Sequence, residues 1–440
     1  MKNTLLLISS LSLSTASLAQ NEDTLADASA KLDTVKVSAD FRQLDLMQIP
    51  SAITVVDAQA IENRNADHLE SILSLAPNAN FATGASRARY FQIRGIGERS
   101  QFIDSVNPSV GLIIDGIDMT GLGGAATLFD IEQVEILRGP QGTVFGANAL
   151  AGAINIKSKQ PTKETEGYVN AKIGNYNTQG LGGALSGSLT DKLQSRFAIN
   201  QTLSDGYIDN IHLNRDDTNN IDELVARAQF TYKMNAKNDI NISLLKADID
   251  NGYDTFSLDN TRETYSDQPG EDKQETSASS LTWHNFALEN AALMLQVTTS
   301  ESDVTYSYDE DWSFPEIDPA SYSNTDEYIR NFERNSIETR ATSNNNSRIF
   351  NESTDWTFGV YQNSKKESLT RAYNGVFSNQ VEHSSIATYT EFTTAISPIT
   401  TLTSGLRIEE SDIEYTDSNN TIEQLNETLW GGKATIDHML

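Results

Sequence analysis

The stretch from Phe129 to Ile156, FDIEQVEILRGPQGTVFGANALAGAINI, constrains the fold of this chain more than any other. Alternating residues from Val134 to Arg138 are typical of a strand. Gly139-Pro140-Gln141-Gly142 then predicts a tight turn, because proline fixes φ and glycine supplies φ > 0. The run Gly146–Ala153 is almost without bulk, which indicates backbone packed closely against something else. The strand Ala153–Ile156 closes the unit.

Composition narrows the class of protein. The chain has 440 residues, enough for one large barrel plus a smaller unit. With 32 Lys+Arg against 61 Asp+Glu, its net charge of −29 makes it a poor binder of nucleic acid. The absence of cysteine excludes disulfide frameworks, thiolate metal sites and Cys nucleophiles. A hydrophobic content of 38% fits a β-barrel with a polar inner face, or an acidic soluble β-rich protein.

Two segments precede the first domain. Residues 1–19 have a positive Lys2, a short apolar core and small residues before Gln20, which predicts a secretory signal peptide rather than a plain disordered N-terminus. Residues 20–40 form a polar leader that ends in Asp33, Thr34, Val35, Lys36, Val37 and Ser38. Val35 and Val37 alternate with polar residues, as in an exposed strand suited to joining the edge of another protein's sheet, or in a simple linker.

Residues 41–160 read as a small α+β domain. We expect a strand at Ile49–Val56, a helix at Ala58–Arg64 capped by Asp57, and a helix at His68–Leu75 capped by Asp67. Ile93-Arg94-Gly95 and Ile114-Asp115-Gly116 each predict a strand followed by a turn. Gly95-Ile96-Gly97 and Gly121-Leu122-Gly123-Gly124 resemble phosphate-binding loops. Neither begins a long helix of a βαβ unit and no Gly-Lys-Ser/Thr follows, so we reject a nucleotide site.

These landmarks occur in the order in which they occur in the plug domain of TonB-dependent outer-membrane receptors, which residues 41–160 resemble. Ala151 stands where members of that family more often have glycine. The matching positions are Arg94, Gly95, Asp115, Gly116, Arg138, Gly139, Pro140, Gly142, Gly146 and Gly152.

The resemblance implies several roles. Residues 33–38 would be the TonB box, which pairs with a TonB-type energy-transducing protein in the periplasm. Arg94 and Arg138 would contact carboxylates of the barrel, although both could be ordinary surface arginines. The apical stretches 82–89 and 98–107 would meet the ligand, and the candidate ligand-binding residues are Arg87, Arg89, Glu98, Arg99 and Gln101.

Residues 166–440 consist of segments of roughly ten alternating apolar and polar residues, which is the pattern of outer-membrane strands. A soluble β-sandwich is the alternative. Tight turns are expected at Asp191-Lys192 and at 236–238, and long loops at 204–220, 250–271, 308–325 and 372–382. The fold class is therefore an α+β plug domain, with a small mixed sheet and short helices, followed by an antiparallel transmembrane β-barrel.

The number of strands is smaller than expected. We count about a dozen, against about 22 for plugged outer-membrane transporters. We therefore expect a fragment or truncated gene product holding about half of the barrel, the alternative being a complete smaller barrel.

Catalytic chemistry is not predicted. The five histidines lack metal-ligand spacing, no Gly-x-Ser-x-Gly elbow occurs, and no carboxylate pair stands out. We predict no enzyme, metal or cofactor.

The leading interpretation is an outer-membrane receptor that takes up a scarce small-molecule ligand, by resemblance a ferric siderophore or other iron complex, and contacts outer-membrane lipid. The alternatives are uptake of an oligosaccharide or cobalamin by the same architecture, or a secreted β-rich binding protein without transport.

Overall fold

The computed structural model describes residues 36–37, 41, 44–45, 52–82, 84–100, 102, 106–317 and 324–438. The predicted signal peptide at residues 1–19 lies outside the described residues. The same holds for Asp33, Thr34, Val35 and Ser38 of the predicted TonB box. Among the described residues, no helix has the length and apolar character needed to cross a membrane.

The first domain is built on a five-stranded mixed sheet with the order β3-β8-β9-β6-β7. Only β6 and β9 run parallel; the other neighbours are antiparallel. The bounds of its strands are β3 (Ala52–Asp57), β6 (Val110–Ile114), β7 (Ile117–Asp118), β8 (Ile131–Arg138) and β9 (Gly152–Ser158). A separate hairpin pairs β4 (Ala79–Ala82) with β5 (Tyr90–Ile93).

Short helices accompany this sheet: α1 (Ala58–Asn63), α2 (Glu70–Leu73), η2 (Gly123–Ala125), α3 (Gly142–Phe145) and η3 (Gly146–Ala149). Asp57 caps α1 as expected, since its Oδ1 accepts from the Ala60 N–H at 2.8 Å. The cap predicted at Asp67 is wrong. α2 begins later, after Leu69, without a side-chain cap, and the Asp67 carboxylate instead forms an ion pair with Lys172.

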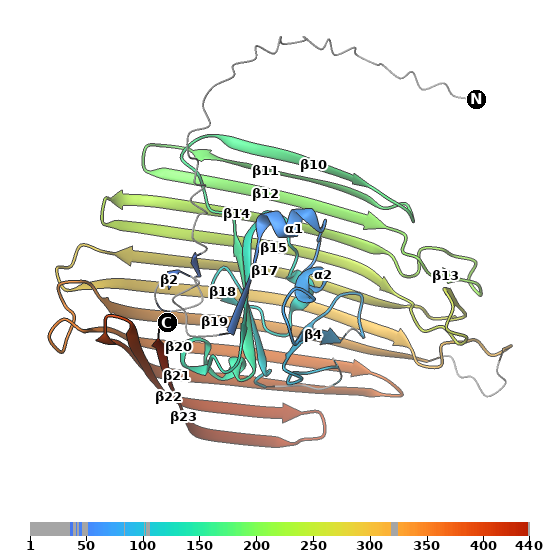
Figure 1. The fold of residues 1–440 in the computed structure, drawn as a ribbon. Helices are drawn as coiled ribbons and strands as arrows, with labels where there is room; N and C mark the ends of the chain where they lie inside the picture. Colours follow the sequence, from blue (N-terminus) through green and yellow to red (C-terminus); the bar gives the residue numbers. More distant parts are fainter. Residues whose placement is uncertain are drawn as a thin grey trace, which may run out of the picture. The chain divides into compact units, whose positions relative to one another are not determined.

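The second part is a twelve-stranded antiparallel sheet in which each strand pairs with the next in sequence (Figure 1). This confirms an antiparallel sheet after a mixed-sheet domain. β10 and β23 form its two edges. Its strands are β10 (Glu166–Ile173), β11 (Gln179–Ser188), β12 (Leu193–Ser204), β14 (Ile221–Asn235), β15 (Asn238–Tyr253), β17 (Gly270–Asn285), β18 (Ala291–Asp309), β19 (Thr325–Ser343), β20 (Thr354–Ala372), β21 (Val376–Ser397), β22 (Thr400–Asp417) and β23 (Ile422–His438).

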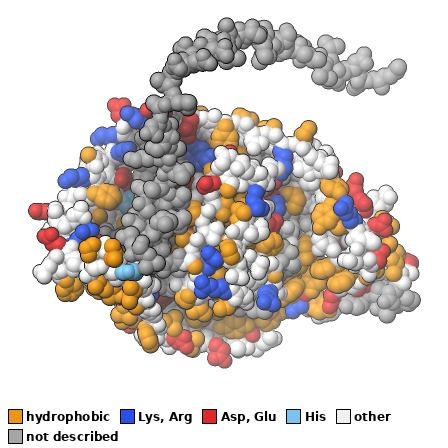
Figure 2. Space-filling view, in the orientation of Figure 1, with side chains coloured by type: hydrophobic (Ala, Val, Ile, Leu, Met, Phe, Trp, Pro, Cys, Tyr) orange, Lys and Arg blue, Asp and Glu red, His pale blue; other side chains and the backbone are white. Residues whose placement is uncertain are grey.

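The strands alternate between a buried face toward the plug and an exposed apolar face. On β12, Arg196 and Ala198 are buried, whereas Phe197 and Ile199 are about half exposed, at 46% and 54%. The buried face is rich in polar side chains, as a wet interior requires. Below, the sheet is called the wall. Plug side chains such as Ile96 and Leu150 remain exposed, and Figure 2 shows hydrophobic and charged side chains interspersed on one face of the molecule.

Three connections at one end of the wall are long, and that end is called the long-loop end; the other is called the short-turn end. Residues 205–220, 254–269 and 310–324 connect strands at the long-loop end. Two minor strands join the first two of these loops, β13 (Asp209–Asn210) and β16 (Glu263–Thr264). The long loop predicted at 372–382 is wrong. Only residues 373–375 separate β20 from β21, because Asn374 and Gly375 adopt the positive φ of a tight hairpin.

Candidate functional site: the boundary between plug and wall

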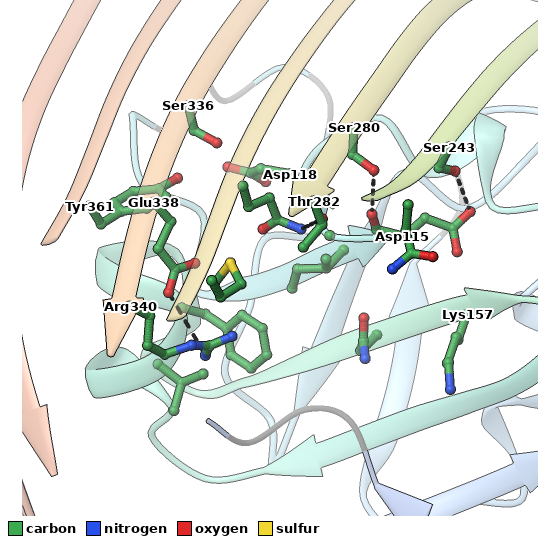
Figure 3. Close-up of a pocket in the computed structure, with 18 of the residues that line it drawn as sticks. Asp115, Asp118, Lys157, Ser243, Ser280, Thr282, Ser336, Glu338, Arg340 and Tyr361 are labelled. Carbon is green, nitrogen blue, oxygen red and sulfur yellow. Dashed lines mark hydrogen bonds and ion pairs between the residues drawn. The ribbon is translucent and has the colours of Figure 1, made fainter. Parts of the chain in front are cut away.

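The turn between β6 and β7 contacts the wall through hydrogen bonds. Asp115 adopts φ +50° and its Oδ2 accepts from Gln229 Nε2 at 3.0 Å and from Ser243 Oγ at 3.1 Å. Ser280 Oγ donates to the Asp115 carbonyl at 3.1 Å, as Figure 3 shows. Gly116 adopts φ +83°, and a Cβ there would lie 2.6 Å from Gln296 Nε2. The Asp-Gly turn predicted from sequence therefore fits the wall closely.

The small-residue run after Arg138 is also a close fit. A Cβ on Gly152 would lie 2.3 Å from the Leu137 carbonyl oxygen, so the first residue of β9 has to be glycine. Gly146 approaches a wall side chain, since a Cβ there would lie 3.2 Å from Arg407 Nη2. By contrast, a Cβ on Gly142 would meet nothing within 4 Å. The predicted close packing thus involves particular glycines of the run and not all of them.

Arg87 and Arg89, both predicted to meet ligand, lie at the long-loop side of the plug and pair with the wall. Arg87 donates to Glu223 from Nε at 2.6 Å and from Nη2 at 3.0 Å. Its Nη1 donates to Glu70 of the plug at 3.0 Å. Arg89 forms a buried ion pair with Asp272 of β17. These contacts fix the apex of the plug to the wall.

Burial disfavours charge on both Glu70 and Arg87, but the side chains around them outweigh it. His68 and Arg87 lower the pKa of the Glu70 carboxyl to about 2 despite that burial. Despite its own burial, Arg87 has its pKa held above the usual range by Glu223 and Glu70. The cluster is therefore ionised at neutral pH.

The remaining predicted apical residues lie apart from these pairs. The Glu98 carboxylate accepts from the Ser109 N–H and Oγ, each at 3.0 Å, and so closes the apical loop. Arg99 is exposed, and Gln101 lies outside the described residues.

The prediction that Arg94 and Arg138 contact barrel carboxylates is wrong for the part of the chain that the structure describes. Arg138 Nη1 donates to the Pro77 carbonyl at 3.3 Å, and the Arg94 guanidinium lies beside Gly139, where a Cβ would be 3.4 Å away. Both arginines therefore brace turns within the plug. The arginines that contact wall carboxylates are instead Arg87 and Arg89, which lie at the apex of the plug.

Asp118, at the end of β7, forms another contact between plug and wall. Its Oδ2 lies 2.8 Å from Lys365 Nζ of β20, and its Oδ1 lies 3.8 Å from Arg334 Nη1 of β19. Asn148 Nδ2 also donates to Oδ2, at 3.0 Å. Burial would raise the pKa of Asp118, but Lys365 and Arg334 hold it well below its usual range. Asp118 was not predicted from the sequence, because Arg334 and Lys365 lie more than 200 positions away.

A cluster of aromatic side chains surrounds the apex at the long-loop end. The Phe102 ring of the plug lies 5.5 Å from Tyr328, 5.8 Å from Tyr308 and 6.2 Å from Tyr306, measured between centroids. The Arg371 guanidinium lies over the Tyr328 ring at 5.0 Å. The strand tyrosines carry no local signal that separates them from membrane-facing residues.

The leader forms a hairpin against the other side of the plug. β1 (Lys36–Val37) pairs with β2 (Leu44–Asp45), so two residues of the predicted TonB box lie in a strand. Val37 is only 1% exposed and packs with plug residues that include Ile113 and Leu137. Phe41, at the turn of the hairpin, lies beside Arg340, whose guanidinium is 5.4 Å from the ring centroid. The hairpin is thus attached near the short-turn end of β19.

A cavity of about 440 Å³ lies between plug and wall below these contacts. Figure 3 shows Ser336, Glu338, Arg340 and Tyr361 reaching it from the wall. Across the described residues, no group of three or more His, Cys, Asp or Glu side chains is placed to hold a metal ion.

Comparison with known proteins agrees with this architecture. Residues 45–153 match the family model of the TonB-dependent receptor plug domain. The chain is 29% identical to the vitamin B12 transporter BtuB of Vibrio vulnificus over 184 residues, which cover 40% of the chain and 28% of that protein. It is 28% identical to the pesticin receptor of Yersinia enterocolitica over 156 residues, covering 35% of the chain and 21% of that receptor.

The fold extends the match beyond the plug. The structure superposes on the ferric yersiniabactin uptake receptor FyuA of Yersinia pestis with a TM-score of 0.75 at 19% identity, covering 89% of the chain and 62% of that structure. Residues 45–153 therefore form a plug domain of the TonB-dependent receptor type, and the described chain as a whole has the fold of a receptor of that kind. The chain spans less than a third of the length of the curated relatives that it matches.

Proposed function

We propose that this chain acts in an outer-membrane receptor that takes up a scarce small-molecule ligand, an iron complex such as a ferric siderophore, with energy from a TonB-type partner. One observation carries the proposal. A single plug presents Phe102 to an aromatic cluster at the long-loop end, and packs with Val37 of the predicted TonB box on another side. Ligand and energy-transducing partner would therefore act on the same small domain. The proposed role is binding and transport rather than catalysis.

The contacts give each step a structural basis. The ligand would settle against the aromatic rings and Arg371, which suit a flat, partly anionic chelate. In the periplasm, residues 33–38 would add as a strand to the partner's sheet. β1 pairs with β2 through one of its two edges, so the partner's strand would add to the other edge or replace β2. Lipid would contact the apolar outer face of the wall.

The ligand could instead be cobalamin or an oligosaccharide. Relatives named for vitamin B12 and for ferric yersiniabactin both match the chain. Expression and growth discriminate the two: induction by iron limitation and growth on a ferric siderophore support the iron complex. Induction by cobalamin shortage instead would reject it.

Deleting Asp33–Ser38 from the full-length gene product tests the energy coupling. Uptake of labelled ligand should be lost, while binding to cells is kept. The matched control removes Asn21–Ala26, also in the leader, and should transport normally. Normal uptake without residues 33–38 would refute the box. Recovery of the protein in the soluble periplasm would instead favour a secreted binding protein.

A further inference from the structure

Two cavities approach each other along the boundary between plug and wall. The lower cavity, of about 440 Å³, and an upper cavity of about 40 Å³ are both lined by Thr120 and Asn148 of the plug. Along β19, Phe332 and Arg334 line the upper cavity, whereas Ser336 and Arg340 line the lower one. The upper cavity therefore lies nearer the long-loop end. Asp118 lines the lower cavity, near the level at which the two cavities share lining residues.

Asp118 closes the boundary at this level. Its carboxylate binds Lys365 and Asn148, and its backbone carbonyl accepts from Arg334 Nη1 at 3.2 Å. Two wall cations thus face one plug carboxylate. Removing that carboxylate would leave two positive charges close together, and a buried charge without a partner is costly. An anion in place of that carboxylate would keep the two cations paired when the plug moves away.

Further basic side chains lie along this boundary. In a chain of net charge −29, the upper cavity is lined by Arg334, Lys365 and Lys366 against the single carboxylate of Glu367. His383 Nδ1, which belongs to a residue lining the same cavity, is buried without a hydrogen-bond partner. Further down, Arg407 Nη2 is buried and likewise has no hydrogen-bond partner. An unpaired guanidinium donor such as Arg407 Nη2 favours a passing acceptor.

We propose that Arg334 and Lys365 form an anion-binding site on the ligand's route, and that Asp118 occupies this site at rest. An anionic oxygen group of the ligand, such as a carboxylate, a phosphate or an ionised chelating oxygen, exchanges with the Asp118 carboxylate at these cations. The exchange keeps the cations neutralised while the plug releases them. The inference rests on the proposed function in that a ligand must pass between plug and wall.

Anion binding by the purified full chain tests the site without any transport. Asp118→Asn removes the negative charge from the site and keeps the side-chain shape. Inorganic phosphate should therefore bind about tenfold more tightly to this variant than to the parent chain. Adding Lys365→Met should abolish that gain. The matched control, Asp272→Asn, also breaks a buried pair between plug and wall, but frees one arginine instead of two cations. Equal phosphate affinity in Asp118→Asn and Asp272→Asn would overturn the proposal.

A second measurement uses the parent chain, in case Asp118→Asn does not fold. Phosphate should speed amide hydrogen exchange in a peptide spanning residues 117–122, while chloride at equal ionic strength should not. Unchanged exchange at saturating phosphate would count against the site. Because neither readout involves uptake, failure of transport and failure of this site are distinguishable.

Discussion

Phe41 lies parallel to Tyr389, with ring centroids 4.7 Å apart and an interplanar angle of 5°. The first ring belongs to the leader and the second to wall strand β21, so one stacked pair attaches the N-terminal hairpin to the wall. Phe41 is only 6% exposed, which means that the pair must separate before the leader can extend.

Phe41→Ala should therefore release the hairpin. A stacked pair contributes about 0.5–1.5 kcal/mol beyond the burial of the rings, so opening should become at least roughly two- to twelvefold more frequent. Limited proteolysis of the leader and affinity for a soluble TonB-type fragment should both increase in proportion. Phe350→Ala serves as the control, since Phe350 is 74% exposed in the connection between β19 and β20. Identical proteolysis of the two variants would show that the stack does not hold the leader.

Gly152→Ala and Gly142→Ala separate two kinds of glycine in one run. The first places a Cβ 2.3 Å from the Leu137 carbonyl oxygen, and overpacking of this kind costs about 1–3 kcal/mol. The second meets nothing and lies within α3, so the free energy of unfolding should stay level or rise slightly. Urea unfolding of the plug, followed by proteolysis, measures both. A Gly152 variant as stable as the parent would contradict the assigned close approach.

Arg87→Met should destabilise the plug apex strongly. It leaves Glu70 and Glu223 buried without their cation, and breaking a buried pair from one side costs about 3–5 kcal/mol. Arg215→Met removes the half-exposed pair with Asp217, whose loss should cost less than about 1 kcal/mol. Thermal unfolding of both variants gives the comparison. Similar losses would mean that water already screens the Arg87 cluster.

Acid should weaken the same cluster in a defined window. The folded pKa of Glu70, about 2, lies below its ordinary value of 4.5, so its contribution is complete above pH 4.5 and is lost as pH falls toward 2. That contribution has an upper limit of about 3 kcal/mol. Unfolding free energies measured between pH 2 and pH 6 should fall less steeply in Glu70→Gln than in the parent. Equal pH dependence of the unfolding free energy in the two proteins would show that Glu70 does not contribute to the loss of stability in acid.

Local chemistry explains why much of the plug could be predicted from sequence. Asp115-Gly116 forms a hairpin turn wherever it lies, and Asp57 caps α1 through a contact three residues away. The alternation of apolar and polar residues predicted the wall strands, because that pattern is also local. The prediction at Asp67 failed because its carboxylate pairs with the distant Lys172 and does not cap α2.

The partners across the boundary could not be predicted. Arg87 meets Glu223, and Asp118 meets Lys365, over separations that no sequence periodicity encodes. A carboxylate facing the plug looks the same in sequence as one facing water. The hairpin at 373–375 was missed for a related reason, since polar strand residues beyond the membrane resemble a loop.

The position of β3 in the plug sheet has a mechanical consequence. β3 is an edge strand, bonded only to β8, and its first pair, Ala52 with Arg138, is the one nearest the leader. Once Val37 and Phe41 have left their partners, tension applied through the leader reaches that pair before the other pairs of β3. If the strand peels, its hydrogen bonds break in succession and never bear the load together, so a modest force suffices. The four strands β8, β9, β6 and β7 would remain joined while β3 detaches, which lets the plug yield in part without unfolding as a whole.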